Sequence, residues 1–359
     1  MLIVRSPVRV SFGGGGTDLP AYYEKYDGAV LSVAINKYFY AIVTKRADDK
    51  VQVISADLRI IETWQDIARI SVKGGELDIP LAVMQDIGTH APLNLFLASE
   101  VLPGTGLGSS ASVCVNILTA LGTYLQMHMT KYELAERAFH IARDVLGMPV
   151  GKQDEYAAAF GGLNYISFSR DGHTSVSPVA LAPDVLRELQ TNLMLFFTGA
   201  SHNSWSILKA QEQSTKQLTG QAIDSLHEIR LLAKTMHTSL LAGNLREFGF
   251  LLNESWQAKR KVSDQISNSR IDHLYDIAVK NGALGGKITG AGGGGFLLLY
   301  CEANAQERVR VALAEEGLRE MAFDFDFQGV RVLVNDPFLD GDAHCGLRWT
   351  FVPSSKQFA

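Results

Sequence analysis

PGTGLGSSA, at positions 103–111, joins an apolar segment at 93–97 to a long helix-compatible segment at 110–126. This pattern predicts a strand, a glycine loop and a helix in that order. Glycines let backbone amides turn inward, and the free N–H groups at a helix start add partial positive charge. The hydroxyls of Ser109 and Ser110 can reach a phosphate or a Mg²⁺ ion. The stretch therefore predicts an anion-binding loop; the alternative is an ordinary strand–helix turn with a serine cap.

The loop differs from two common nucleotide-binding motifs. It lacks the lysine of the GxxxxGK[ST] loop. It also departs from GxGxxG, because Ser109 stands where a third glycine would follow Gly104 and Gly106. The chain has no GxGxxG turn about 20 residues before an acidic strand end, which argues against a nucleotide-cofactor oxidoreductase.

Two further glycine clusters flank this loop in the sequence, GGGG at 13–16 and KITGAGGGG at 287–295. Fourteen of the 33 glycines lie within 13–16, 104–108 and 285–295. Such clusters cost backbone entropy, so they need a reason such as positive φ or a close approach to a ligand or another backbone. The alternative for the last cluster is a β-bulge or packing between domains.

Arg9 stands among apolar neighbours in an expected strand, RVSF at 9–12, that leads into the first glycine cluster. A buried arginine requires a carboxylate partner. The segment GKQDEY, at 151–156, offers Asp154 at the start of a short helix with apolar neighbours. The alternative for Asp154 is a solvated acid in the first turn, stabilised by the helix dipole.

The order of elements predicts an α+β fold in two halves, because strands dominate the first 60 residues and helices dominate later. The loop at 169–183, with two prolines and several serines, is the expected boundary. Two late strands, near 323–327 and 330–334, are expected to close the second half. The expected parts are an N-terminal domain at 1–183, a C-terminal domain at 184–340 and an irregular tail at 341–359.

Composition excludes several classes of protein. Of the 359 residues, 47% are hydrophobic and 20% charged, which indicates a folded globular chain. The formal net charge of −5 argues against a nucleic-acid partner. No apolar run approaches the roughly 18 residues of a membrane span, and Arg5 and Arg9 interrupt the start where a signal peptide would be apolar. Three separated cysteines form neither a disulfide framework nor a zinc motif, so we expect a cytoplasmic protein.

Taken together, the segments resemble the galactokinase, homoserine kinase, mevalonate kinase and phosphomevalonate kinase (GHMP) superfamily. SPVRVSFGGGGTDLP at 6–20, PGTGLGSSAS at 103–112 and KITGAGGGGF at 287–296 are similar to its three motifs and occur in its order. The glycine run followed by Thr-Asp, and the segments GKQDEYAAAFGG and GGKITGAGGGGFLLLY, are most similar to the sugar 1-kinases that act on D-glycero-D-manno-heptose 7-phosphate. This resemblance covers most of the chain.

The resemblance implies an N-terminal domain like the second domain of ribosomal protein S5, a ferredoxin-like C-terminal domain, and a site in the cleft between them. It implies ATP with Mg²⁺, and an activity that phosphorylates the C1 hydroxyl of the heptose 7-phosphate to the 1,7-bisphosphate, for nucleotide-activated heptose and surface polysaccharide. The ATP-binding residues it implies are Gly104, Gly106, Leu107, Gly108, Ser109 and Ser110. For the metal it implies Ser110 and an acid on the helix before Asp154. An ungapped count lands on Arg143, and Asp144 is the nearest acid.

By the same resemblance, Asp154 is the catalytic base and Arg9 is its cationic partner. The substrate residues we expect are Gly15, Thr17, Asp18, Lys152, His202, Lys209, Gly292 and Gly293. His202 is a departure, since an arginine is expected there in the heptose kinases. The implied partner is a small sugar phosphate, with no nucleic acid or membrane; the oligomeric state stays open, with a homodimer as one option. The alternatives are a fucose- or galactose-type 1-kinase of the same fold, and a non-catalytic ligand sensor.

Overall fold

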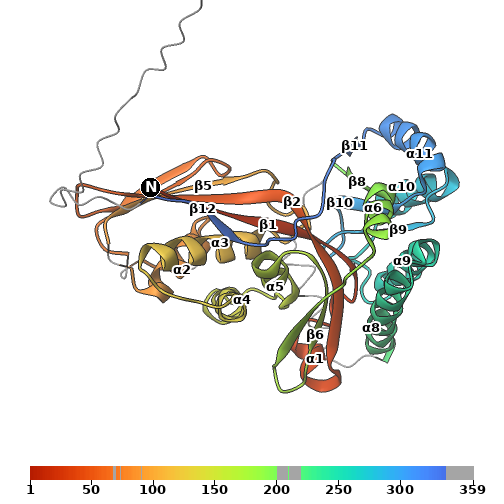
Figure 1. Cartoon of the computed structure of the whole chain (residues 1–359), viewed down its shortest axis with the longest axis horizontal. Coiled ribbons are helices and arrows are strands. Elements are labelled where there is room, and N and C mark those ends of the chain that lie inside the picture. Colours follow the sequence, from red (N-terminus) through yellow and green to blue (C-terminus); the bar gives the residue numbers. More distant parts are fainter. Residues whose placement is uncertain (68–69, 73, 90, 200–208, 210–219, 337–359) are drawn as a thin grey trace, which may run out of the picture.

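The computed structural model describes residues 1–336 except 68–69, 73, 90, 200–208 and 210–219. Two sheets organise the described chain, one in each half of the molecule (Figure 1). The first sheet has the order β12-β1-β2-β5-β3-β4, and β6 and β7 extend it beside β2. Its strands are β1 (Leu2–Gly13), β2 (Gly28–Lys45), β3 (Val51–Ser55), β4 (Ile60–Trp64), β5 (Leu93–Ser99), β6 (Leu163–Phe168), β7 (Thr174–Pro178) and β12 (Arg331–Asn335).

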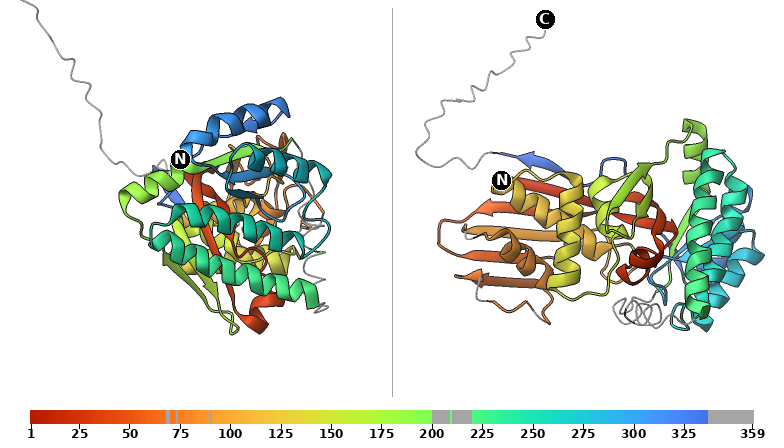
Figure 2. Two further views of the ribbon diagram at one scale, coloured as in Figure 1. Left: turned by 90° about the vertical axis from the view of Figure 1, so that its right-hand side faces the viewer. Right: turned by 90° about the horizontal axis from the view of Figure 1, so that it is seen from below.

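Helices of the first half lie on one side of this sheet, as Figures 1 and 2 show. They bury an apolar face against the alternating inward residues of the strands, such as Val4 of β1 and Val43 of β2. The helical segments are α1 (Pro20–Tyr26), α2 (Asp78–Ile87), α3 (Ser109–Tyr124), α4 (Lys131–His140), the π-helical segment η2 (Ile141–Val145) and α5 (Gln153–Phe160). A capping box between Thr130 and Glu133 starts α4.

The second half is a four-stranded sheet of order β11-β8-β10-β9 packed against helices. Its buried strand β10 (Phe296–Tyr300) has no exposed residue, so both of its faces are covered. The other strands are β8 (Leu193–Phe197), β9 (Gly285–Ile288) and β11 (Arg319–Glu320). The helices are α6 (Pro183–Asn192), α8 (Gly220–Leu241), α9 (Leu245–Arg260), α10 (Ser269–Lys280) and α11 (Ala303–Glu315).

One hydrophobic core crosses the boundary between the halves. Phe12 at the end of β1 packs edge-on against Phe248 of α9, with ring centroids 5.2 Å apart. Aromatic pairs in this geometry stabilise beyond the area they bury, by about 0.5–1.5 kcal/mol. The end of β1 is therefore fixed against the second half, and the glycine run that follows it lies between the two.

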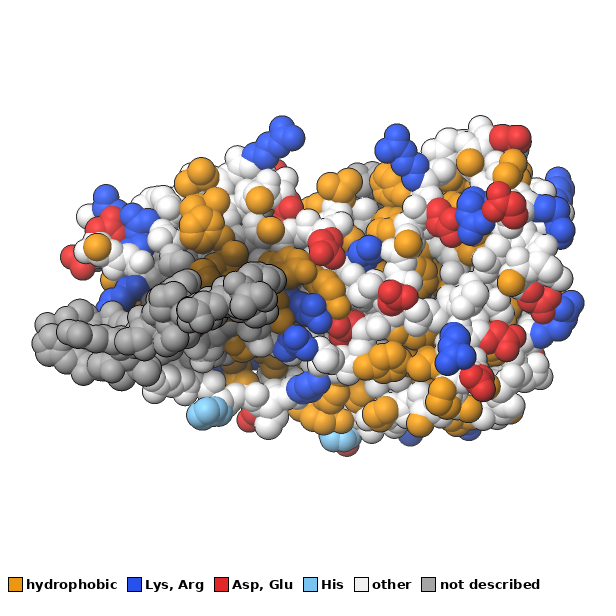
Figure 3. Space-filling view, turned by 45° about the horizontal axis from the view of Figure 1, so that its top comes forward, with side chains coloured by type: hydrophobic (Ala, Val, Ile, Leu, Met, Phe, Trp, Pro, Cys, Tyr) orange, Lys and Arg blue, Asp and Glu red, His pale blue; other side chains and the backbone are white. Residues whose placement is uncertain are grey.

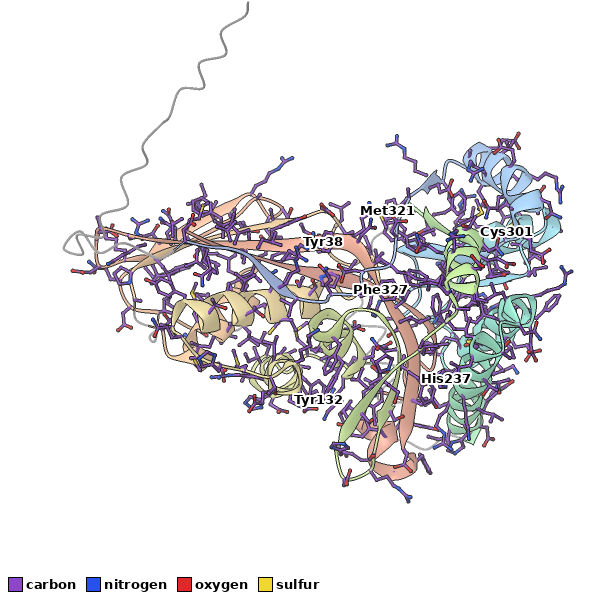
Figure 4. All side chains as sticks on the ribbon, viewed as in Figure 1. Tyr38, Tyr132, His237, Cys301, Met321 and Phe327 are labelled. Atoms are coloured by element: carbon purple, nitrogen blue, oxygen red, sulfur yellow. The ribbon has the colours of Figure 1, made fainter. Side chains whose placement is uncertain are left out.

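The structure differs from the sequence-based expectation in two segments, and the domain boundary at 183/184 stays a prediction. The loop expected at 169–183 contains β7, which pairs with β6. The late strands do not close the second half: β12 pairs with β1, and Asp326 N donates to Ala34 O at 2.8 Å. Tyr38, labelled in Figure 4, donates its hydroxyl to Asp326 at 2.9 Å. The returning segment satisfies the hydrogen-bonding edge of β1, a long-range effect that local pattern does not reveal.

The described helices include none that is long and apolar enough to cross a membrane. On the face shown in Figure 3, acidic and basic side chains alternate over the second half. This face therefore carries mixed charge, in contrast to the buried cations described below. The expected tail at 341–359 lies outside the described residues.

Candidate active site

Segments from both halves surround a cavity of about 320 Å³. They are the end of β1 with its glycine run, the loop before α3, the start of α5, the buried face of α9 and the loop after β9. This convergence brings the three glycine clusters of the sequence to one place. Its glycines and its polar or charged residues are Arg9, Ser11, Gly15, Gly16, Asp18, Gly104, Gly106, Gly108, Ser109, Ser110, Gly151, Gln153, Asp154, Glu155, Lys259, Lys287 and Gly290.

Arg9 and Asp154 form a two-pronged ion pair at this cavity. Arg9 Nε lies 2.7 Å from Asp154 Oδ1, and Arg9 Nη2 lies 2.6 Å from Asp154 Oδ2. The third guanidinium nitrogen, Nη1, donates to Gly106 O at 2.7 Å. The carboxylate partner that the sequence predicts for Arg9 is therefore Asp154. Bidentate pairing of this kind fixes the orientation of a carboxylate as well as its charge.

The loop before α3 has the backbone of an anion site. Gly104, Gly106 and Gly108 all have positive φ, between 73° and 78°. A Cβ on Gly106 would lie 2.4 Å from the Thr289 carbonyl oxygen, and one on Gly108 would lie 3.1 Å from Asp154 Oδ2. Glycine is therefore required at Gly106 both by conformation and by space. The α3 helix begins at Ser109 and leaves its first N–H groups without helical partners.

Leu107 does not line the cavity. Its side chain is fully buried in the core, and its carbonyl oxygen accepts from Arg9 N at 2.9 Å. The expected contact between Leu107 and ATP is not supported at the side chain, because the loop alternates glycines that face the cavity with residues that face the core.

The late glycine cluster braces the loop before α3. A Cβ on Gly290 would lie 2.6 Å from Gly106 Cα, and one on Gly295 would lie 2.4 Å from Thr105 O. Gly292 and Gly293, expected at the substrate, lie elsewhere. Gly293 N donates to the Ile266 carbonyl oxygen at 2.7 Å, and a Cβ on Gly292 would meet the same oxygen at 2.7 Å. These two glycines pack against the chain between α9 and α10 and are absent from the cavity lining.

Asp18 reaches the cavity from the first glycine cluster, beside Gly15. Its Oδ1 accepts from Gly16 N at 2.8 Å and its Oδ2 from Gln153 N at 3.4 Å. Burial, and secondly the charge of Asp154, raise the pKa of the Asp18 carboxyl. A Cβ on Gly151 would lie 2.1 Å from Asp18 Oδ2, so the first residue of GKQDEY is a glycine for reasons of space.

Thr17 does not contact the cavity, contrary to expectation. Its side chain is fully buried, and its hydroxyl lies 2.8 Å from Gly14 O and 3.1 Å from Ala29 N. The hydroxyl is therefore used to hold the glycine run onto β2. Local sequence does not distinguish a threonine that contacts a ligand from one that fixes its own loop.

Two of the cationic residues expected to hold a substrate phosphate, Lys152 and Lys209, are described by the structure, and neither lines the cavity. Lys152 is 5% exposed, and its Nζ lies 2.7 and 2.9 Å from the two carboxylate oxygens of Glu136. Its charge is thus already paired with Glu136 of α4. Lys209 is exposed and does not line the cavity, and His202 lies outside the described residues.

Two other lysines occupy the cavity, Lys259 of α9 and Lys287 of β9. Both are at most 7% exposed, and Lys259 Nζ donates to Gly15 O at 3.0 Å. Burial lowers the pKa of Lys259 to about 8. Burial, then Lys259 and Arg9, lower the pKa of Lys287 to about 7, so these cations lie near one another. The sequence offered one signal: Lys259 follows Trp256 by three residues, which places the two on one face of a helix. In the structure, Trp256 and Lys259 are both buried on that face of α9.

Three polar atoms at the cavity have no hydrogen-bond partner among the described residues. They are Ser11 Oγ, Gln153 Oε1 and Glu155 Oε2. Buried polar atoms are nearly always satisfied in folded proteins, so unsatisfied ones at a cavity indicate a bound ligand or water. The Glu155 side chain is 1% exposed, and burial, then Asp154, raise its pKa well above the usual value.

The donor set of the cavity fits a Mg²⁺ ion shared with phosphates. Mg²⁺ takes oxygen ligands and is usually held by one or two protein groups together with substrate phosphates. Ser110 offers a hydroxyl at the cavity, and within the described chain no group of three His, Cys, Asp or Glu forms a closed metal cage. Asp144 does not fit: its side chain is 61% exposed, and its Oδ2 lies 2.8 Å from His140 Nδ1.

Comparison with known proteins agrees with this geometry. The GHMP kinases N terminal domain matches residues 65–162, and the GHMP kinases C terminal family matches residues 236–318. A D-glycero-alpha-D-manno-heptose 7-phosphate kinase of Campylobacter jejuni is 30% identical over 91% of this chain and 97% of its own length. An L-fucokinase/L-fucose-1-P guanylyltransferase of Bacteroides fragilis is 24% identical over 87% of this chain and 36% of its own length.

Solved structures give the same result. A structure described as a D-glycero-D-manno-heptose 1-phosphate kinase from Bacteroides thetaiotaomicron superposes with a TM-score of 0.78 at 27% identity, covering 94% of this chain and all of that one. Lactococcus lactis galactokinase, in complex with galactose, shares the fold with a TM-score of 0.74 at 18% identity, over 92% of this chain and 94% of that one.

The chain belongs to the GHMP kinases, and the two-domain α+β fold expected from its sequence is confirmed. It is an ATP-dependent enzyme that phosphorylates an alcohol group. Within the family it is a sugar kinase, similar over nearly its whole length to a heptose 7-phosphate kinase.

Proposed function

We propose that the protein transfers the γ-phosphoryl group of ATP to the C1 hydroxyl of D-glycero-D-manno-heptose 7-phosphate, giving the 1,7-bisphosphate. The observation that carries the proposal is the Arg9–Asp154 pair, which lies at the same cavity as two buried lysines and the loop before α3, here called the phosphate loop. The Campylobacter jejuni heptose 7-phosphate kinase, at 30% identity, supports the choice of acceptor.

In this proposal Asp154 accepts the proton of the acceptor hydroxyl as the phosphoryl group transfers. A sugar hydroxyl has a pKa far above neutrality, so a nearby carboxylate assists its loss of a proton. Arg9 orients both oxygens of Asp154 and stabilises negative charge that moves onto the transferring group. Gly108 brings the phosphate loop against the same carboxylate, since even a Cβ there would touch it.

The phosphates of ATP are assigned to the loop before α3, where glycine N–H groups and the start of the helix favour negative charge. Ser110 is assigned to Mg²⁺, which when bound neutralises charge on the phosphates. Asp18 and Gly15 are assigned to the sugar, because both line the cavity and Asp18 Oδ2 accepts from the backbone N–H of Gln153, the residue before Asp154.

Lys259 and Lys287 are assigned to the acceptor phosphate in place of Lys152, Lys209 and His202. A sugar 7-phosphate brings about two negative charges near neutral pH, and these need cationic partners inside the site. Binding a dianion raises the pKa of both lysines and so offsets the cost of burying them. Lys259 Nζ donates to Gly15 O, a residue assigned to the sugar, and this contact supports the assignment of Lys259 to the acceptor.

A kinase for an unphosphorylated sugar is the second candidate, supported by the fucokinase relative and the shared galactokinase fold. The deciding experiment incubates the protein with ATP and Mg²⁺ and with heptose 7-phosphate, free heptose, fucose or galactose. Phosphorus NMR of the products identifies the new bond. A 1,7-bisphosphate from the heptose 7-phosphate supports the proposal, and efficient turnover of fucose or galactose alone contradicts it.

A further inference from the structure

We propose that Glu136 of α4 is a positioning residue, which holds the first turn of α5 so that Asp154 is presented to the acceptor hydroxyl. Glu136 does not line the cavity; it acts through Lys152 and Tyr156, which bind its carboxylate. The inference rests on the role of Asp154 in the proposed function and not on the identity of the sugar.

The Glu136 carboxylate binds α5, which lies beside α4 (Figure 1), at two points four residues apart. Its Oε1 accepts from Lys152 Nζ at 2.7 Å and from the Tyr156 hydroxyl, and its Oε2 accepts from Lys152 Nζ at 2.9 Å. Residues four apart share a helix face, whereas Asp154, two residues from each, leaves the helix on the opposite face. The turn is therefore held by Glu136 on one side and by Arg9 on the cavity side.

All three N–H donors of the Lys152 ammonium are used inside the protein. Two point to the Glu136 oxygens, and Lys152 Nζ also donates to Gly172 O, in the turn between β6 and β7, at 3.0 Å. The side chain is 6% exposed, and its Nζ lies 5.7 Å from the ring centroid of Tyr23 and 5.4 Å from that of Phe139. A buried ammonium requires such partners, so Lys152 is fixed, and Glu136 is the carboxylate that balances its charge.

The backbone of the same turn also holds Asp18, the acid assigned to the sugar. Lys152 N donates to Asp18 O at 3.2 Å, and Gln153 N donates to Asp18 Oδ2 at 3.4 Å. A shift of this turn would therefore displace both Asp18 and Asp154, and a misplacement of about 1 Å can cost about 100-fold in rate. The phosphate loop precedes α3, so ATP binding should not depend on Glu136.

The test measures kcat and the KM for ATP in the double variant Glu136→Leu/Lys152→Met. Apolar side chains of similar size replace the ion pair, so no charge is left buried without a partner. We expect kcat to fall by about tenfold or more, while the KM for ATP changes by less than about twofold. The matched control is Asp86→Leu/Arg137→Met, because Arg137 follows Glu136 on α4 and its ion pair joins α2 instead of α5. Its kcat should stay within about twofold of wild type, even where a urea melt shows lower stability.

A near-wild-type kcat in the folded Glu136→Leu/Lys152→Met variant overturns the inference, as does an equal fall of kcat in the control. Should the double variant fail to fold, Tyr156→Phe decides, because it removes one hydroxyl and keeps the ion pair. We expect its kcat to be about threefold lower or less than that, at an unchanged KM for ATP, and a wild-type kcat overturns the inference.

The acceptor in this test is whichever of heptose 7-phosphate, free heptose, fucose and galactose the wild-type enzyme phosphorylates fastest. A wrong assignment of the sugar therefore leaves the test intact. Asp154→Asn, measured alongside, separates the remaining failures. Wild-type turnover in Asp154→Asn refutes the role of Asp154 and the inference with it. Loss of turnover in Asp154→Asn, with none in Glu136→Leu/Lys152→Met, refutes the positioning role alone.

Discussion

Arg9 holds both carboxylate oxygens of Asp154, at 2.7 Å from Nε to Oδ1 and at 2.6 Å from Nη2 to Oδ2, although the two residues are 145 positions apart. The β1 strand supplies one and the first turn of α5 the other. The Arg9 side chain is 5% exposed and that of Asp154 is 26% exposed, so the pair is shielded on the protein side and open on the cavity side. This arrangement presents a fixed carboxylate to a ligand.

Replacing Asp154 by asparagine tests the role of that carboxylate. The change keeps the shape but removes the negative charge, so it removes the proton acceptor. We expect kcat to fall by roughly two orders of magnitude or more. ATP affinity by calorimetry should stay near wild type, because the phosphate loop is unchanged. Near-wild-type turnover in a folded variant would remove Asp154 from the mechanism.

Replacing Ser110 by alanine tests the phosphate side. The hydroxyl is assigned to Mg²⁺, so its loss should raise the Mg²⁺ concentration for half-maximal activity by about tenfold, equivalent to ~1.4 kcal/mol. Sugar affinity, measured separately by calorimetry, should not change. An unaltered Mg²⁺ titration would assign the phosphates to backbone amides and Ser109 alone.

Gly290→Ala tests the contact between the late glycine cluster and the phosphate loop. A Cβ there would lie 2.6 Å from Gly106 Cα, at φ +71°. Gly88→Ala is the matched control, because Gly88 has φ +70° and open space around it. Both changes cost backbone strain, but crowding should make Gly290→Ala worse by about 1–3 kcal/mol in free energy of unfolding. It should also raise the KM for ATP. Equal losses in denaturant melts would refute the bracing role.

The pKa values of the buried lysines predict how stability depends on pH. Lysine has a pKa of about 10.4 in the unfolded chain, against about 7 for Lys287 in the fold. Between these values the unfolded state binds more protons, so the contribution of Lys287 to the free energy of unfolding rises with pH. Below about pH 7 that contribution is flat, because both states hold the proton.

The measurement is a pair of urea melts of the ligand-free protein, at pH 7 and pH 9.5. Lys287→Met should be more stable than wild type at pH 7, with the difference shrinking at pH 9.5. A difference that grows with pH would show that Lys287 is stabilised as a cation in the fold.

Many elements of the fold could be predicted from local sequence patterns. The apolar β strands, the capping box at Thr130 and the glycine runs at 13–16 and 104–108 each leave a local signal. The pairing of Arg9 with Asp154 was predictable because an arginine between apolar neighbours needs an acid. The pairing of β12 with β1 was not predictable, because a strand pairs with the edge that lies beside it in space, and that edge can be far away in the sequence.

The site residues show the same difference between features set by local sequence and features set by distant packing. Backbone requirements could be read from the sequence, since glycine alone fits where chains approach closely. Side-chain direction could not: Lys152 lies beside Asp154 in sequence, yet it points to Glu136. Lys259 lies in a run of three basic residues, of which it alone lines the cavity. Only the packing of α9 reveals which one is buried.

The most direct test of the account compares kcat/KM for D-glycero-D-manno-heptose 7-phosphate with that for free heptose, in wild type and in Lys259→Met. Lys261→Met is the control, since its side chain is 53% exposed on the same helical run. We predict a preference for the 7-phosphate in the wild-type enzyme. That preference should fall by about tenfold or more in Lys259→Met, because this variant loses a charge-assisted hydrogen bond to the acceptor phosphate. The KM for ATP should be unchanged in both variants. A wild-type enzyme that prefers free heptose would contradict the account.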